Sequence, residues 1–342
     1  NRLLARGSYD RARQFAQTAI AHPGTSSTVT YSALLVLGET YVAGDTFGFA
    51  ENAWRQALEL ASSGKVVDAS GDDVRRLRRQ LATSIYRQGE QAAGVGKTDI
   101  AVAHFQRIDS VLPGSDIAVT GRFDAANTLL QAERWLPAVN ELSRFRQDFP
   151  SHPLTDSIRE KLVFAYISSD QPIRAADELV ASTGASGPAM EDQLRAAELY
   201  HQAGAIQKRD RIYLAYLGQI PVLREPEDAQ THLLDQTFRQ RLIDSDVAAP
   251  RFREQLVTAE LASDWHSKDT LGWAGQAALK LAEIQANRFA AVELRAPLAE
   301  SLSRKQQLLE AARSRYDQAR QFGGDGVISQ ATFKKAELYR QF

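Results

Sequence analysis

A single pattern of small and bulky apolar residues recurs at a fixed interval along much of the chain. Ala138 lies 37 residues after Ala101 and 37 residues before Ala175. Pro113 and Pro150 are separated by the same interval, and each closes one unit of the pattern. A period of about 20–50 residues with two helices per unit is typical of solenoids. The sequence therefore predicts an all-α fold of stacked helical hairpins.

Two positions in each unit explain how the paired helices pack. Antiparallel helices approach closely only where small side chains face each other at their crossing. The first crossing position holds Gly38, Gly89, Ala126, Val163 and Ala197, and the second holds Ala12, Ala50, Ala101, Ala138 and Ala175. We expect these residues to be buried between helices, because bulky side chains there would force the helices apart.

The unit that begins near Ser27 resembles the tetratricopeptide repeat. That family has seven characteristic positions. In chain order they hold a bulky residue, then Leu, then a small residue (Gly or Ala), then Tyr, then Ala, then an aromatic residue, and finally Ala. These positions are filled here by Leu34, Leu37, Gly38, Tyr41, Ala50, Trp54 and Ala57. The resemblance covers residues 1–221 and implies a right-handed α-solenoid that serves as a protein-binding scaffold.

The period is lost beyond Pro221, so we predict two regions, a repeat solenoid over residues 1–221 and divergent hairpins with longer helices over residues 222–342. Pro226 and Pro297 are expected to start helices, since proline favours the first helical turn. Ser329 is expected to cap the last helix.

The chain opens inside a half repeat and closes inside a helix at Phe342. We therefore expect it to be a fragment of a longer protein, with any leader or anchor lying outside it.

The balance of charge gives no general attraction to nucleic acid. Lysine and arginine total 41, aspartate and glutamate total 42, and the net charge is −1. Non-specific nucleic-acid binding depends on excess positive charge, and none is present. No apolar run approaches the ~18–20 residues that span a bilayer. We predict protein partners, with no nucleic acid and no membrane-spanning segment.

Cysteine is absent from all 342 positions. This composition excludes disulfides, cysteine-ligated metal centres and a cysteine nucleophile. Proteins that fold in oxidising compartments avoid stray thiols. The absence therefore favours a periplasmic location, with a cytoplasmic one as the alternative.

No motif in the sequence supports catalysis or cofactor binding. The run Gly94–Thr98 suggests a phosphate loop, but Gln91 stands where that motif requires glycine, and the run follows a helix. None of the histidines has a zinc-site spacing, and no Gly-x-Ser-x-Gly elbow is present. We predict a non-enzymatic protein without catalytic, cofactor-binding or metal-binding residues.

The resemblance implies that the first helices of the hairpins line a concave groove, which is the expected partner-binding surface. Aromatic and aliphatic residues with few charges are found at these positions, which suits an extended or helical peptide. The groove residues implied in this way include Leu35, Glu39, Tyr86, Glu90, Phe123, Asn127, Glu160 and Phe164. The chaperone-binding subgroup of the family has Lys and Asn in this groove. Leu35 and Glu39 stand here instead, so an acidic tail ligand is disfavoured.

Two further clusters have alternative interpretations. Arg75, Arg76, Arg78 and Arg79 could hold an acidic partner, but a solvated helix face beside Asp72 and Asp73 is favoured. Tyr200, Tyr213 and Tyr216 could stack a ligand, but their repeat positions favour a core role.

The linker from Phe145 to Pro153 resembles a "Phe-Pro-x-x-Pro" segment of bacterial periplasmic repeat proteins, of the Tol–Pal-associated and outer-membrane-assembly lipoprotein types. This resemblance implies a scaffold of a cell-envelope complex. The alternatives are a cytoplasmic adaptor of the co-chaperone kind, or the repeat region of a larger enzyme whose catalytic domain lies elsewhere.

Overall fold

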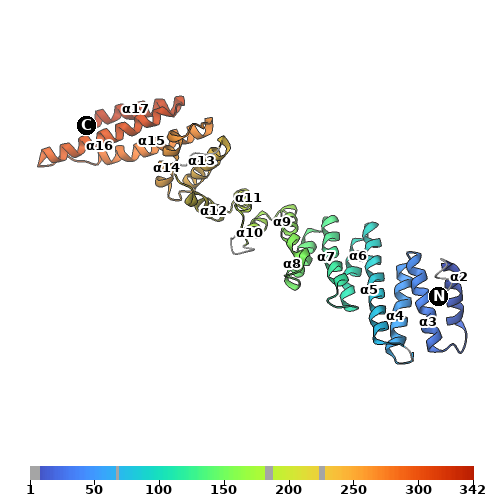
Figure 1. Cartoon of the computed structure of the whole chain (residues 1–342). Helices are drawn as coiled ribbons and strands as arrows, with labels where there is room; N and C mark the ends of the chain where they lie inside the picture. Colours follow the sequence, from blue (N-terminus) through green and yellow to red (C-terminus); the bar gives the residue numbers. More distant parts are fainter. Residues whose placement is uncertain (1–7, 67–68, 182–187, 223–227) are drawn as a thin grey trace. The chain divides into compact units, whose positions relative to one another are not determined.

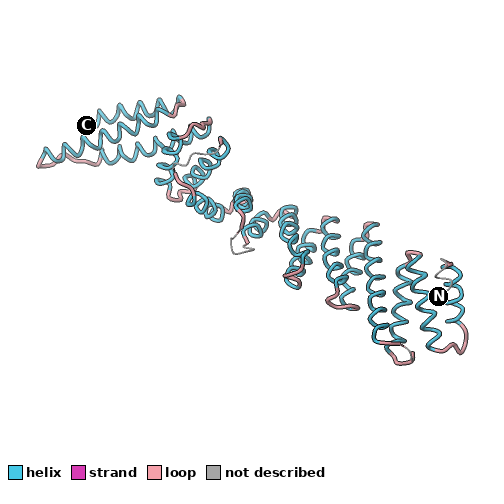
Figure 2. Tube along the Cα trace, in the orientation of Figure 1, coloured by secondary structure: helices cyan, strands magenta, loops and turns pink. Residues whose placement is uncertain are grey.

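The computed structural model describes residues 8–66, 69–181, 188–222 and 228–342. All regular secondary structure in these ranges is helical (Figure 2), which confirms the all-α prediction. Within the same ranges, no helix combines the length and the apolar composition needed to cross a bilayer. The chain divides into two compact units, residues 1–178 and residues 179–342.

Unit 1 is a row of antiparallel helices in which each helix from α2 to α8 packs on the next one along the chain (Figure 1). Odd-numbered helices from α3 onward are the first helices of the hairpins, and even-numbered helices are the second. The helices are α2 (Tyr9–Ala21), α3 (Ser27–Ala43), α4 (Phe47–Ser62), α5 (Gly71–Gly94), α6 (Thr98–Arg107), α7 (Asp116–Gln131), α8 (Trp135–Asp148), α9 (Ile158–Ser168) and α10 (Pro172–Val180), which contains the unit boundary. This arrangement confirms the solenoid of helical hairpins, while its right-handed sense stays a prediction.

The turn inside each hairpin repeats the same backbone hydrogen bond. The amide of Lys97 donates to the carbonyl of Ala92 over 2.9 Å, and the amide of Arg134 donates to that of Leu129 over 2.9 Å. Such a bond back across the helix end satisfies a carbonyl that the helix leaves free. It recurs at Thr46 to Tyr41, Gln171 to Tyr166 and Ala205 to Tyr200. The sequence period therefore corresponds to one repeated turn geometry, which continues into unit 2.

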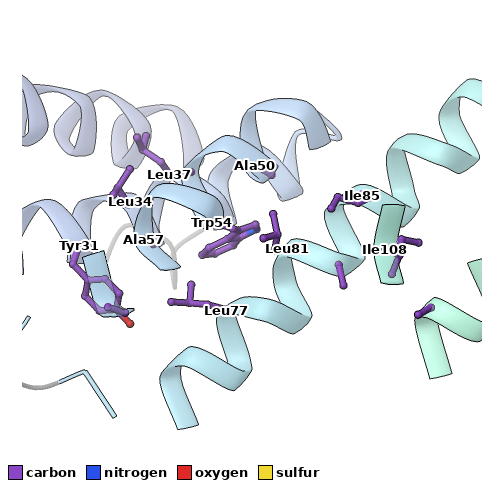
Figure 3. Packing of buried hydrophobic residues seen from close by; sticks show 14 of the residues in the cluster. Tyr31, Leu34, Leu37, Ala50, Trp54, Ala57, Leu77, Leu81, Ile85 and Ile108 are labelled. Atoms are coloured by element: carbon purple, nitrogen blue, oxygen red, sulfur yellow. The ribbon is translucent and has the colours of Figure 1, made fainter. Parts of the chain in front are cut away.

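The predicted crossing residues are all buried. Glycine is required at two of them because an aromatic ring from the second helix fills the space of a side chain. A Cβ at position 38 would lie 2.4 Å from Cε2 of Trp54, and one at position 89 would lie 2.6 Å from Cε1 of Phe105. Trp54 continues across to the next hairpin, where it lies close to Leu77 and Leu81 of α5 (Figure 3).

This packing predicts a large difference between two glycine substitutions in the first hairpin. Gly38→Ala should lower the free energy of unfolding by about 1–3 kcal/mol, because the new methyl group overpacks the core against Trp54. Gly48→Ala, on α4, meets only Gln88 at 3.5 Å and should raise it by up to about 1 kcal/mol through helix propensity. Urea denaturation of the two variants tests this, and equal stabilities would contradict the close crossing.

A polar cluster around Glu51 joins three helices of unit 1. The Glu51 carboxylate on α4 accepts hydrogen bonds from Arg107 at the end of α6 over 2.5 and 2.8 Å, and from Gln88 on α5 over 2.6 Å. Arg55 adds another bond over 2.5 Å. Burial alone would raise the pKa of Glu51, but these hydrogen bonds outweigh burial and lower it to about 2. The cluster fixes α5 between its two neighbours.

Unit 2 continues the antiparallel pairing with longer helices toward its end. Its helices are α11 (Met190–Gln202), α12 (Ile206–Gln219), α13 (Ala229–Asp244), α14 (Ala249–Ala262), α15 (Lys268–Ala290), α16 (Leu298–Gln321) and α17 (Asp325–Gln341). As predicted, α16 starts directly after Pro297. Pro226, which was also expected to start a helix, lies outside the described residues.

The prediction that Ser329 caps the last helix is wrong. Gly323 and Gly324 adopt positive φ angles of 75° and 80°, a conformation that glycine tolerates without steric cost. These two residues complete the turn, so α17 already begins at Asp325. Ser329 lies inside the helix.

Arg209 stands where the other hairpins have the crossing alanine, and it is buried. Its guanidinium pairs with the Asp210 carboxylate at 2.6 Å and donates over 2.7 Å to the hydroxyl of Ser245, the C-cap of α13. Tyr213 stacks on Phe238 with 4.1 Å between ring centroids. Tyr200 and Tyr213 are buried and Tyr216 is half-buried, so this tyrosine cluster belongs to the core of unit 2. A polar and aromatic contact thus replaces the small-residue crossing where the period is lost. The predicted boundary after residue 221 describes this loss of period and stays a prediction.

Candidate functional site

An open groove of about 790 Å³ lies between α3 and α5. We call it the α3–α5 groove. One wall comes from α5 and the other from the end of α3 and the turn after it, while Phe47 and Trp54 of α4 contribute to its floor. Its lining residues are Tyr9, Glu39, Val42, Ala43, Asp45, Phe47, Trp54, Arg76, Arg79, Gln80, Thr83, Ser84 and Arg87.

A second groove of about 640 Å³, the α5–α7 groove, lies on the other side of α5. Its lining residues are Tyr86, Glu90, Ala93, Phe105, Asp124, Asn127, Thr128, Leu130, Gln131 and Lys161. The two grooves meet at an ion pair of α5, because Arg87 lines the first groove, Glu90 lines the second, and their side chains are 2.7 Å apart. The first helices α3, α5 and α7 therefore present a run of hollows along one side of unit 1.

Some of the predicted binding residues line these grooves. Glu39 lies in the α3–α5 groove, and Tyr86, Glu90 and Asn127 lie together in the α5–α7 groove. The Tyr86 hydroxyl donates to the Asp124 carboxylate over 2.6 Å. Burial, together with this bond to an anion, raises the pKa of Tyr86, so its hydroxyl stays protonated. Whether these side chains contact a partner stays a prediction.

The other predicted binding residues do not line either groove. Leu35 packs half-buried against the core of unit 1. Phe123 is also half-buried, with its ring against the edge of Phe145 at 5.6 Å. Glu160 and Phe164 are exposed on α9. A substitution of Phe123 would disturb the core as well as any binding surface.

The arginines at the start of α5 have two interpretations from the sequence, a solvated helix face and a site for an acidic partner, and the structure has features of both. Arg75 and Arg76 pair with Asp72 and Asp73, as expected for a solvated helix face. Arg76 and Arg79 also line the α3–α5 groove, whereas Arg78 does not. Helical spacing could have revealed this, because Arg76, Gln80, Thr83, Ser84 and Arg87 follow one another at intervals of three, four and one and share a helix face.

A buried cluster of titratable groups lies in unit 2 around Glu260, which is fully buried. One carboxylate oxygen contacts Nε2 of His232 at 2.7 Å and accepts from Gln236 over 2.9 Å. The other contacts Nδ1 of His266 at 3.0 Å and accepts from the Thr270 hydroxyl over 2.8 Å. Burial alone would raise the pKa of Glu260, but these hydrogen bonds outweigh it and lower that pKa. Both carboxylate oxygens are engaged by side chains of α13, α15 and the loop before α15, so we interpret the cluster as structural.

Within the described ranges, no group of three or more His, Asp or Glu residues has the arrangement of a metal site. The predicted absence of metal, cofactor and catalytic residues stays a prediction.

Comparison with known proteins identifies no close relative. No family model matches the chain, and no curated protein matches it. Among solved structures, it is similar to a tetratricopeptide repeat protein from Parabacteroides merdae, with 13% identity over 91% of this chain and 98% of that one, at a TM-score of 0.28. It is also similar to the Naa15/Naa10 complex bound to HypK-THB, with 15% identity over 99% of this chain and 49% of that one, at a TM-score of 0.36. A third similar structure is the P58(IPK) TPR domain, with 13% identity over 98% of this chain and 99% of that one, at a TM-score of 0.22. At these scores the similarities carry no argument, and the fold assignment rests on the helices of this chain.

Proposed function

We propose that this chain is a tetratricopeptide-type scaffold of a bacterial cell-envelope complex, which binds a segment of a partner protein along the first helices of unit 1 and catalyses no reaction. One observation carries the proposal. Residues expected to face a groove from the repeat positions alone line two adjoining hollows on α3, α5 and α7. They are Glu39 in the first, and Tyr86, Glu90 and Asn127 in the second.

The chemistry of the hollows supports a peptide partner. Tyr86, Phe105 and Leu130 supply aromatic and aliphatic surface, and Asn127 and Gln131 supply side-chain amides that can donate to and accept from a peptide backbone. Interfaces gain most of their energy from a few such anchors surrounded by polar groups. An extended or helical segment fits a groove that crosses several helices.

The envelope location rests on two features of the sequence. Cysteine is absent throughout, which suits folding in an oxidising compartment. The Phe-Pro-x-x-Pro linker forms a packed corner between α8 and α9, in which Phe145 contacts Phe149 at 5.1 Å and His152 at 6.0 Å between ring centroids. The Thr155 hydroxyl closes this corner by donating to the carbonyl of Phe149 over 2.7 Å.

A charge reversal in the groove tests partner binding. The full chain, immobilised, should capture a partner from a solubilised envelope fraction. Glu90→Lys should reduce recovery of that partner by at least about tenfold, because a reversed charge at a complementary interface costs several kcal/mol. Glu59→Lys is the matched control, since Glu59 is exposed on the second helix α4 and outside both grooves. Equal loss in both variants, or in neither, would contradict groove binding.

The location is tested separately with the full-length gene product. Fractionation of cells that express it from its own promoter should place it with the envelope. Recovery in the cytoplasmic fraction would support the adaptor alternative and would leave the groove experiment to be repeated with cytoplasmic extract.

A further inference from the structure

Two buried polar atoms of the α3–α5 groove lack a hydrogen-bond partner. They are Nε1 of Trp54 and Oγ of Ser84, and each residue is 1% exposed. Both residues line the groove, one from α4 and one from α5. Buried polar atoms in folded proteins nearly always have a partner, and an exception needs an explanation. An indole N–H can only donate, so the group that satisfies Trp54 has to be an acceptor.

The groove also has walls of opposite charge. Arg76, Arg79 and Arg87 line it from α5, and Glu39 and Asp45 line it from α3 and the turn that follows. Arg76 and Arg87 already pair with Asp73 and Glu90. In the described part of the chain, Arg79, Glu39 and Asp45 form no ion pair. The groove is therefore lined by one cation and two carboxylates that form no ion pair in the described part of the chain.

Part of the basic wall results from a departure from the repeat. Helix α5 has 24 residues, whereas α3 has 17 and α7 has 16. The additional turns begin at Gly71, where Ser70 and Asp73 form a capping box. Arg76 lies on this added part of the helix and Arg79 lies just after it, whereas Arg75 and Arg78 do not line the groove.

We propose that the α3–α5 groove is a subsite for an internal stretch of the partner segment in which an acidic side chain stands next to a basic one. The acidic side chain pairs with Arg79, and the basic one pairs with Glu39 or Asp45. A carbonyl oxygen of the same stretch accepts the hydrogen bonds of Trp54 and Ser84. The inference rests on the proposed function, and it adds the chemistry of the bound segment.

The observations favour this occupant over a polyanion or a small molecule. Glu39 and Asp45 would repel the phosphates of a nucleic acid at close range. The groove is wide open, and Glu39, Asp45 and Arg79 are exposed along its edges, whereas a small-molecule site buries most of its ligand. An extended peptide can satisfy both walls and the floor at once.

Selection from a library of short random peptides, displayed on phage, tests the proposal with the full chain as bait. Peptides selected on the wild type should share an acidic and a basic residue at neighbouring positions. Arg79→Glu should weaken the binding of these peptides by at least about tenfold, since like charges then meet at the interface. Arg78→Glu, the same charge change one residue away and outside the groove, should change binding less than about twofold.

A second selection, on the Arg79→Glu variant, should return peptides with a basic residue in place of the acidic one. Ser84→Ala should weaken the binding of the peptides selected on the wild type by about fivefold, the cost of one hydrogen bond. Trp54→Phe should weaken their binding equally, provided that far-UV circular dichroism shows this variant to be folded.

The outcomes separate this subsite from the proposed function. Peptides that lose binding with Glu90→Lys but tolerate Arg79→Glu would overturn the subsite and leave the scaffold proposal standing. Selected peptides without an acidic residue, or equal sensitivity to Arg78→Glu and Arg79→Glu, would also overturn it. If no peptide is selected, or if binding is confined to an oligonucleotide competitor, both proposals fail.

Discussion

Glu260→Gln is expected to lower the free energy of unfolding of unit 2 by about 3–5 kcal/mol, the cost of breaking a buried charge cluster by removing one partner. Both carboxylate oxygens are engaged, with His232 and Gln236 on one and His266 and Thr270 on the other. Glutamine keeps the size of the side chain but replaces one of these acceptors by an NH₂ group. That group would face two of these donors, and in either orientation at least one buried donor, from Gln236 or Thr270, is left without an acceptor.

The loss should be confined to unit 2, because all the groups involved lie on α13, α14, the start of α15 and the loop that joins α14 to α15. Amide hydrogen exchange on the full chain measures this locally, since protection should fall in these helices and remain in α3 to α8. Glu283→Gln is the matched control. Glu283 also lies in unit 2, but it pairs at the surface with Lys280 at 2.9 Å, and surface pairs contribute at most about 1 kcal/mol. Equal protection in the two variants would show that the Glu260 cluster does not hold these helices together.

The hairpins could be predicted from the sequence because their physical determinants are local and periodic. Ala101, Ala138 and Ala175 recur at one interval because each sits at a helix crossing with no room for a larger side chain. Gly38 and Gly89 accompany aromatic rings at a fixed distance along the chain for the same reason. The same packing requirement therefore appears in several units of the sequence and can be recognised by comparing them.

The residues that line the two grooves could be predicted only where they occupy positions of the repeat. Glu39, Tyr86 and Glu90 occupy repeat positions, and they line hollows. Arg76 lies on the added turns of α5 and Arg79 lies just after them, both outside the groove positions of the repeat, so their place in the α3–α5 groove did not follow from the family pattern. Phe164 occupies a groove position but is 54% exposed, lines neither groove, and has its ring 5.5 Å from that of Trp135 at the start of α8.

The buried polar clusters could not be predicted at all. Glu51 and Arg107 are 56 residues apart, and His232 and Glu260 are 28 residues apart. Neither separation is a multiple of the repeat, and nothing in the local sequence distinguishes these charges from solvated ones. Only the stacking of successive hairpins brings them together. In unit 1 this polar contact matters for the grooves, because α5 forms a wall of both.

Because of the Glu51 cluster, the free energy of unfolding of unit 1 should decrease at acidic pH. The pKa of Glu51 is lowered from its ordinary value of 4.5 to about 2. A lowered carboxyl pKa in the folded state stabilises the fold above the unfolded pKa, and the contribution disappears as pH falls through the folded one. The shift corresponds to about 3 kcal/mol, present at neutral pH and lost progressively between about pH 4.5 and pH 2.

The measurement compares the wild type with Glu51→Gln by urea denaturation at a series of pH values. At neutral pH the variant should be less stable by about 3 kcal/mol, because Arg107 and Gln88 lose an anionic acceptor. The difference should narrow as the pH falls, since other carboxylates titrate equally in both proteins and cancel. Glu59→Gln, an exposed residue of the same helix, should follow the wild type throughout. A difference between wild type and Glu51→Gln that stays constant from neutral pH to pH ~2.5 would mean that the Glu51 carboxylate is not held as an anion by its neighbours. Apolar packing alone, and not the Glu51 cluster, would then hold α5 in its position between the two grooves.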